Sequence, residues 1–398
     1  MNETMKNKKM KTILITSGPV HEHLDDVKII TNKFKGGRIA ALAKRIVNTD
    51  SYYDDATHIY RKPYKVVYLC SKFTSIPSAP SNLLEIVYHN GFNDYYEKVK
   101  KYSKEVDAVI LGAAVCNLIP VEPIKGKFPS HNYKPNDVIP INFKIAPRVV
   151  DMVKEENPKV NLFAFKLLSG VKHEELIDAA YDIALESKAT AVIANDLQEL
   201  NTKHIVTKEK GVLKYKEENY HKFILECIEN EYYSSIPTKL EINDNGRAIN
   251  KCCDLYEKYK EFFQKTYGDE KYIFGTIAVI DRGTNIITTT TRGKRDFTEW
   301  TKVEVDHSSK HVYYDSKKAT LNAPLLDHIF KQFPTSTAIV HYHDFQDDVS
   351  TLSYAIPGTE KDSIRDFSPD SKDYKGFLND CRMGFNIEGH GTFEILYT

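Results

Sequence analysis

The chain has 398 residues, of which 41% are hydrophobic and 28% are charged. This mix is typical of chains that build packed cores, and at ~150 residues per domain it predicts two or three domains. Basic and acidic residues number 55 each, so the net charge is zero. This balance disfavours a general binder of nucleic acid or anionic membranes, which would need surplus positive charge.

The N-terminus is basic, but its apolar run of about four residues is too short for a signal peptide. No stretch approaches the ~20 apolar residues of a membrane span. The six cysteines are scattered and form no CxxC motif. We therefore expect a reduced, cytoplasmic protein, with neither nucleic acid nor membrane as a partner.

Short β-rich runs alternate with amphipathic helical stretches in the first part of the chain. We expect strands at 12–16, 66–70, 108–112, 162–165 and 191–194, and helices at 37–47 and 174–187. Strands separated by helices favour an α/β domain with a Rossmann-like parallel sheet. Ligands of such sheets lie at the carboxyl ends of the strands. Here those ends are residues 16–19, 112–120, 165–170 and 194–197.

A polar stretch at 232–246 is the expected domain boundary, which gives domains at 1–235 and 245–398. A helix is expected at 248–267 and another at 323–333. Strands are expected at 277–280, 285–290, 311–314, 338–342 and 393–397. Strands at this closer spacing predict an α+β domain with a mostly antiparallel sheet.

The first strand ends in a Thr-Ser-Gly-Pro turn, and the first helix begins at the pair Gly36-Gly37. Paired glycines let backbone N–H groups approach a ligand, and a helix N-terminus favours an anion. Lys28 and Arg38 add positive charge. The alternative is an ordinary loop with solvated lysines, because the segment contains neither GxGxxG nor a P-loop motif.

Five motifs raise the weight of the first interpretation: ILITSG…DDVKIITN…GG, AAVCNLIP, GKFPS…INFKIAP, FAFKL and AVIANDL. In this order, across residues 12–230, they resemble the phosphopantothenate–cysteine ligase family. The resemblance implies ATP or CTP with Mg²⁺, an acyl-nucleotide intermediate, and amide formation with cysteine in coenzyme A biosynthesis. It places Asn32 at the substrate carboxylate and acyl group, and Lys127 on a mobile loop over the reacting phosphate.

The same resemblance implies a wider binding set. Its members are Ser17, Gly18, Lys28, Gly36, Gly37, Ala114, Asn117, Phe165, Lys166, Asn195 and Asp196. The chain also departs from the family pattern, because Pro19, Phe34, Asn117 and Leu168 replace residues that would donate or accept hydrogen bonds, and Ile39 replaces a glycine of the loop. Each lost bond costs ~1 kcal/mol, or ~1.5–3 where a charge takes part. Several losses together could remove turnover while nucleotide binding persists.

His341 and His343 end an apolar strand, and alternation along a strand places both imidazoles on one face, where they can bind one metal ion. The alternative is a pair of histidines at the edge of the core. Residues 250–398 resemble the class II aldolase/adducin family. This implies His390 as a third ligand of a Zn²⁺ ion and a phosphate site at Thr291, Gly293 and Thr320. The family's acid–base glutamate falls on Asn322, whose amide cannot exchange a proton in the same way.

Three functions remain open from the sequence. The first is a ligase of the phosphopantothenate–cysteine type that carries an aldolase-like, metal-binding domain. The second is a metal-dependent lyase or isomerase of a small phosphorylated carbonyl compound. The third is a non-catalytic protein built from two degenerate enzyme domains. The resemblances imply a homo-oligomer, a dimer in the ligase family.

Overall fold

The computed structural model describes residues 10–49, 52–54, 59–61, 63–79, 82–208, 210–240, 246–263, 273–294, 296–365, 367, 378–379 and 382–397. Two compact units divide the chain. The first contains Met1–Lys208 and Lys214–Ile228, and the second contains Glu209–Leu213 and Glu229–Thr398. The division near residue 228 differs from the boundary expected at 235–245, because strand β17 (Ser234–Pro237) pairs with the second sheet.

An eight-stranded sheet forms the centre of the first unit. Its order is β16 (Val212–Lys216), β15 (Thr202–Thr207), β14 (Ala191–Asp196), β13 (Asn161–Leu168), β9 (Ala108–Leu111), β1 (Thr12–Ser17), β7 (Lys65–Cys70) and β8 (Leu84–Tyr88). All pairs from β14 to β8 are parallel, and β15 is antiparallel to β14. The consecutive residues Ile13, Leu14 and Ile15 are fully buried, as in strands covered on both faces. The expected α/β fold with a parallel sheet is confirmed.

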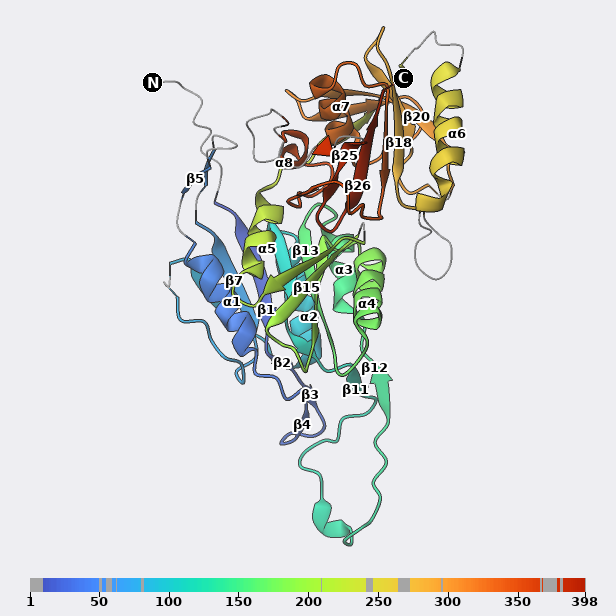
Figure 1. The fold of residues 1–398 in the computed structure, drawn as a ribbon. Coiled ribbons are helices and arrows are strands. Elements are labelled where there is room, and N and C mark those ends of the chain that lie inside the picture. The colour runs from blue at the N-terminus through green and yellow to red at the C-terminus, as the bar shows by residue number, and fades with distance from the viewer. Residues whose placement is uncertain are drawn as a thin grey trace. The chain divides into compact units, whose positions relative to one another are not determined.

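Helices cover both faces of this sheet (Figure 1). They are α1 (Gly37–Val47), α2 (Gly91–Ser103), α3 (Val149–Glu156), α4 (His173–Glu186) and α5 (Tyr220–Glu229). The bounds of α1 match the prediction, and its buried stripe contains Ile39, Leu42, Ala43 and Ile46. The order in which strands are added to the sheet reverses at β1: β7 and β8 lie on one side of it, and the later strands β9, β13 and β14 lie on the other. Such a switch point is where parallel sheets bind ligands.

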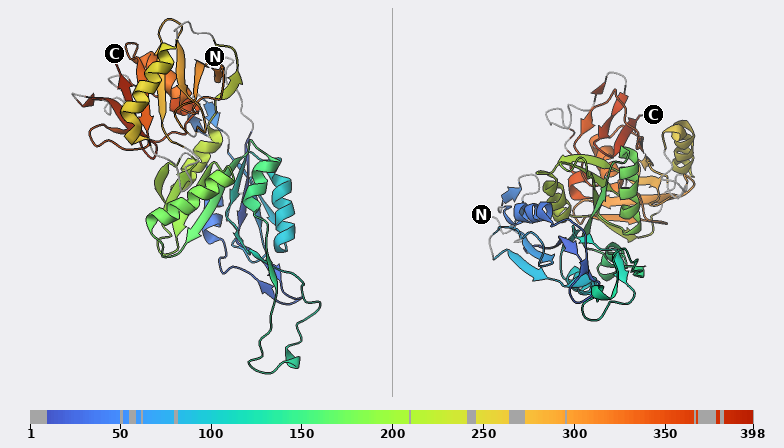
Figure 2. Two further views of the ribbon diagram at one scale, coloured as in Figure 1. Left: turned by 90° about the vertical axis from the view of Figure 1, so that its right-hand side faces the viewer. Right: turned by 90° about the horizontal axis from the view of Figure 1, so that it is seen from below.

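Short ladders extend from the carboxyl edge of the sheet. They pair β2 (Pro19–Val20) with β10 (Ala114–Val115), β3 (Glu22–His23) with β4 (Ile29–Ile30), and β11 (Leu118–Pro120) with β12 (Phe143–Ile145). Between β11 and β12 the chain projects as a long arm that carries the short 3₁₀ helix η1 (Ser130–Asn132), as the left view of Figure 2 shows. A separate ladder pairs β5 (Tyr52–Asp54) with β6 (Ile59–Arg61).

A ten-stranded sheet forms the second unit. Its order is β17, β21 (His311–Tyr314), β20 (Trp300–Asp306), β19 (Ile286–Thr290), β18 (Thr276–Asp281), β22 (Ala338–Tyr342), β26 (Gly391–Leu396), β25 (Arg382–Ile387) and β23 (Thr351–Leu352), and β24 (Leu378–Asn379) pairs with β25. Only the β17–β21 and β23–β25 pairs are parallel among the described ladders. The mostly antiparallel α+β architecture is therefore confirmed.

Alternation along β18 gives this sheet two packed faces. Ala278 and Ile280 belong to the cluster under α7 (Ala323–Gln332), whereas Ile277 and Val279 belong to the cluster under α6 (Arg247–Tyr259). Helix α6 ends earlier than the predicted 248–267 and passes into the 3₁₀ turn η2 (Lys260–Phe262); residues 264–267 lie outside the described part.

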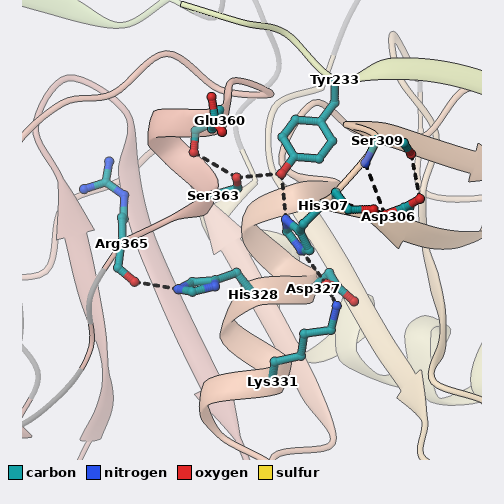
Figure 3. A network of polar contacts seen from close by, with 11 residues as sticks. Tyr233, Asp306, His307, Ser309, Asp327, His328, Lys331, Glu360, Ser363 and Arg365 are labelled. Atoms are coloured by element: carbon teal, nitrogen blue, oxygen red, sulfur yellow. Dashed lines mark hydrogen bonds and ion pairs between the residues drawn. The ribbon is translucent and has the colours of Figure 1, made fainter. Parts of the chain in front are cut away.

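A polar network fixes α7 against β17 and the short helix α8 (Glu360–Ser363), as Figure 3 shows. The Asp327 carboxylate lies 2.7 Å from His307 Nε2 and 2.6 Å from Lys331 Nζ. On the other side of the imidazole, Nδ1 lies 2.6 Å from the Tyr233 hydroxyl, which also contacts Ser363 at 3.0 Å. Because a carboxylate only accepts, His307 donates to Asp327 through Nε2. The network thereby orients the helix that begins beside Asn322.

Candidate functional site

The turn after β1 packs directly against the start of α1. Gly18 and Gly36 have φ angles of 73° and 75°, in the left-handed region that favours glycine. A Cβ atom on Gly36 would lie 2.4 Å from Ser17 Oγ and 2.6 Å from the Gly18 nitrogen. The close approach therefore requires glycine, and it brings the predicted residues Ser17, Gly18, Gly36 and Gly37 together at the switch point.

Asn32 joins this turn to the next strand end. Its side-chain nitrogen donates to the carbonyls of Ala114 and Val115, over 3.1 and 3.0 Å. Two carbonyl acceptors determine the orientation of the amide, because only its NH₂ group can donate. The segment that leads to the glycine pair is thus attached to β10, beyond the end of β9, and two residues predicted to share a site are in contact.

Asp25 was not singled out from the sequence, yet it connects the two predicted lysine segments. Its buried carboxylate accepts the N–H groups of Val27, Lys28 and Phe128 and lies 3.1 Å from Lys28 Nζ. The N–H of Phe128 is the strongest influence that holds the pKa of Asp25 well below its usual range. The loop that carries Lys28 is thereby joined to the segment that carries Lys127. In sequence, a lone Asp in a loop gives no sign of a partner about a hundred residues away.

Replacement of Asp25 by asparagine is expected to destabilise the first unit, because its charge-assisted bonds to three backbone N–H groups are lost. The low folded-state pKa means that this contribution is present above the ordinary carboxyl pKa of 3.8 and is lost on further acidification. Urea unfolding at pH 7 measures the loss. Asp26→Asn, at the exposed neighbouring position, is the matched control. Equal stability of both variants would contradict the assignment.

Lys127 is exposed on a segment that is held at both of its neighbours. The Asp26 N–H donates to the Gly126 carbonyl over 3.0 Å, and the Phe128 ring lies 5.7 Å from Lys28 Nζ. Both predicted lysines therefore belong to one side of the first unit, where their charges can act on the same anion.

The remaining predicted residues of the first unit gather at the ends of β13 and β14. Phe165 pairs in register with Ile193, and Lys166 with Ala194. Asn195 is buried, and its side-chain nitrogen has no hydrogen-bond partner in the part of the chain that the structure describes. Asp196 accepts the N–H groups of Gln198 and Gly170, at 2.7 and 3.1 Å, so part of its hydrogen-bonding capacity serves the local turn.

The residues that depart from the family pattern have different environments. Ile39 is buried and fills the space beside Gly112, where an added Cβ would lie 2.7 Å from its Cδ1 atom. Phe34 is 37% exposed, and Asn117 is exposed. Pro19 begins β2 and pairs with Ala114. Ile39 is thus a core residue here, whereas Phe34 lies at the surface.

Three imidazoles converge in the second unit, as the sequence predicted. His341 belongs to β22, His343 follows it, and His390 precedes β26; one potential ligand atom of each lies within 4.8 Å of the others. His341 Nδ1 lies 2.9 Å from the Thr392 carbonyl, so it donates there and leaves Nε2 available. Within the described residues, that Nε2 atom and both ring nitrogens of His390 are buried and have no hydrogen-bond partner.

Burial keeps these imidazoles uncharged. It lowers the pKa of His390 to about 3 and that of His341 and His343 well below the ordinary value. Neutral imidazole is the form that binds metal. A pocket of about 310 Å³ borders the cluster, and its lining includes Phe274, His343, Phe345, Gly389 and His390. Three nitrogen donors, of which those of His341 and His390 are buried, next to an open space fit a metal ion with a free coordination position.

The residues predicted to bind a phosphate lie near one another, but the hydroxyl groups of both threonines already contact neighbouring side chains. Thr320 Oγ1 lies 3.1 Å from Thr276 Oγ1, and Thr291 donates to Glu299 over 3.3 Å. A carboxylate at Thr291 disfavours a phosphate at the same hydroxyl. Gly293 has a φ of 67°, as a tight turn requires. Asn322 is buried at the start of α7, and its side-chain oxygen finds no hydrogen-bond partner among the described residues.

Comparisons with known proteins bear on the first of the two resemblances, that to the phosphopantothenate–cysteine ligase family. No protein-family model matches the chain. The chain is 28% identical, over 188 residues, to the coenzyme A biosynthesis bifunctional protein CoaBC of Thermococcus kodakarensis, which covers 47% of this chain and 42% of that protein. It therefore spans less than half the length of that relative.

Among the described helices, none is both long and apolar enough to cross a membrane.

Two groups of solved structures are also similar. One includes the DNA/pantothenate metabolism flavoprotein from Streptococcus pneumoniae, with a TM-score of 0.46, 23% identity, and coverage of 55% of this chain and 98% of that chain. The other includes an L-fuculose 1-phosphate aldolase, with a TM-score of 0.27, 12% identity, and coverage of 40% and 78%.

Proposed function

We propose that the first unit is a nucleotide-dependent ligase of the phosphopantothenate–cysteine type. The observation that carries the proposal is the bond from Asn32 to the Ala114 and Val115 carbonyls, which joins the two strand ends where an acid and a nucleotide would meet. The sequence similarity to CoaBC supports it. The nucleotide would be ATP or CTP with Mg²⁺.

The chemistry follows from the weak electrophilicity of a carboxylate. The acid first attacks the nucleotide α-phosphate and expels pyrophosphate, and the cysteine amine then attacks the acyl carbon and expels the nucleotide monophosphate. The protein's contribution is to position the reactants and to neutralise phosphate charge. Lys28 and Lys127 are suited to the second task, and the glycine turn offers N–H groups to phosphate oxygens.

Pyrophosphate release tests this proposal directly. Purified protein with phosphopantothenate, cysteine, Mg²⁺ and nucleotide should release pyrophosphate and form the amide. Parallel reactions with ATP and CTP identify the nucleotide, and omission of cysteine should leave an acyl-nucleotide on the protein. No release with either nucleotide, together with no nucleotide binding by calorimetry, would overturn the ligase proposal and favour a non-catalytic role.

For the second unit we propose a metal centre, Zn²⁺ by the nature of its donors, held by His341, His343 and His390. When bound, such an ion polarises a carbonyl group. The unpartnered imidazole nitrogens beside an open pocket favour a lyase or isomerase of a small phosphorylated carbonyl compound as a second function.

The projecting arm supports the expected homo-oligomer. Val138 on the arm is 90% exposed, and Ile145, at the end of β12 where the arm returns, is 74% exposed. Exposed apolar side chains of this kind can take part in a protein–protein contact. We propose that the arm packs against a second copy of the chain. Val138→Asp combined with Ile145→Asp should convert the dimer into a monomer in light scattering, whereas Glu122→Gln on the same arm should not. A wild-type monomer at working concentration would contradict this.

A further inference from the structure

A short segment from between β15 and β16 lines the pocket beside the three histidines. This segment, Glu209–Leu213, belongs to the second compact unit, although most of the chain before it belongs to the first. Lys210 and Val212 from the segment share the lining of the pocket of about 310 Å³ with His343 and His390. The whole lining therefore lies in one compact unit, and it contains a lysine in addition to imidazole donors.

Close packing holds the segment against the turn that carries His390. Gly389 has a φ of 65°, in the left-handed region that favours glycine. An added Cβ there would lie 2.7 Å from Leu213 Cδ2 and 3.1 Å from the Val212 carbonyl oxygen, and Leu213 is buried. Any side chain at residue 389 would push the segment away. Glycine at this position thus keeps the lysine segment next to the histidine cluster.

The rest of the lining suits a small anionic molecule. Phe274 stacks on His343, with ring centroids 4.4 Å apart, and Phe345 adds a second aromatic wall. Among the described residues that line the pocket none is acidic, so no carboxylate of the lining competes for Lys210. The volume lies at the lower end of the ~300–1,000 Å³ of ligand pockets, which favours a small molecule.

The residues that the resemblance implies for a phosphate already have protein partners. Thr291 donates to Glu299, and Thr320 Oγ1 lies 3.1 Å from Thr276 Oγ1. A phosphate at Thr291 would therefore meet the negative charge of Glu299. A phosphorylated substrate needs a cation elsewhere, and Lys210 offers an ammonium group, which donates charge-assisted hydrogen bonds to phosphate oxygens.

We propose that Lys210 binds the phosphate group of the substrate of the second unit and determines its specificity for a phosphorylated compound. The carbonyl group of the substrate would face the three imidazole donors, and its phosphate would accept hydrogen bonds from the Lys210 ammonium group. This inference rests on the second proposed function, namely a small phosphorylated carbonyl compound as the substrate. It adds the residue that distinguishes such a compound from its uncharged counterpart.

Calorimetric titration with dihydroxyacetone phosphate tests this placement. Zinc-loaded wild-type protein should bind the compound, and Lys210→Gln should raise the Kd by at least ~10-fold, in line with the loss of one charge-assisted hydrogen bond. Lys210→Arg keeps the charge and should recover most of the affinity. Lys216→Gln removes an exposed lysine of β16 outside the pocket lining, and this matched control should bind as wild type does.

Two further measurements separate a role in binding from a structural role. Zinc content and thermal unfolding of Lys210→Gln should match wild type, and added salt should weaken binding by wild type more than binding by Lys210→Gln, because salt screens the lysine charge. An unchanged Kd for Lys210→Gln, or a loss as large in Lys210→Arg, would overturn the inference alone. Failure of zinc-loaded wild type to bind dihydroxyacetone phosphate would overturn the proposed substrate class and the inference together.

Discussion

Replacing Asn32 by alanine is expected to lower the rate of pyrophosphate release by at least ~100-fold. The substitution removes two hydrogen bonds and leaves the Ala114 and Val115 carbonyls without their donor, at ~1–3 kcal/mol for each unsatisfied group. The loss also frees the segment before the glycine pair, and a displacement of ~1 Å can cost ~100-fold in rate. The measurement is pyrophosphate release at saturating nucleotide, phosphopantothenate and cysteine.

Thr31→Ala is the matched control, because Thr31 is the exposed neighbour in the same segment. Its turnover should stay within about twofold of wild type. Urea unfolding separates the two ways in which Asn32→Ala could fail: a small loss of stability together with a large loss of rate indicates a role at the site. Wild-type turnover by Asn32→Ala would contradict the placement of the acid at this strand end.

Local periodicity was enough to predict much of the fold. Helix α1 matches its expected bounds because Ile39, Leu42, Ala43 and Ile46 repeat at helical spacing and are all buried. The convergence of His341 and His343 follows from strand alternation alone. His390 came from a family resemblance, since no local pattern connects a turn near residue 390 to a strand that ends at residue 342.

Local sequence patterns do not predict contacts between residues that are distant in the sequence. The bond from Phe128 N–H to Asp25 joins two loops that carry no periodic signal. Strand β17 was read as part of a linker because it is short and polar, yet it pairs in parallel with β21. The burial of Lys294 was also missed, because a lysine after a glycine turn is usually solvated. In each case a partner distant in sequence decides the structure.

His341→Ala is expected to abolish stoichiometric zinc binding. The substitution removes one of three donors, and its effect should exceed the ~10–100-fold loss of affinity that follows removal of a residue that only orients a metal ligand by a hydrogen bond. Wild-type protein with zinc at 100 times its Kd should gain ~2.7 kcal/mol of stability, a gain that the variant should lack. Elemental analysis after dialysis and thermal unfolding with and without added zinc measure both effects.

His311→Ala is the control, because His311 lies on β21 of the same sheet but outside the cluster. It should retain one zinc ion per chain. The effect on the first unit is equally informative: His341→Ala should still release pyrophosphate, because the residues proposed for ligation belong to the other compact unit. Stoichiometric zinc in His341→Ala would place the metal elsewhere. Loss of pyrophosphate release with the zinc would mean that ligation depends on the metal-binding unit, and the two functions could no longer be treated as independent.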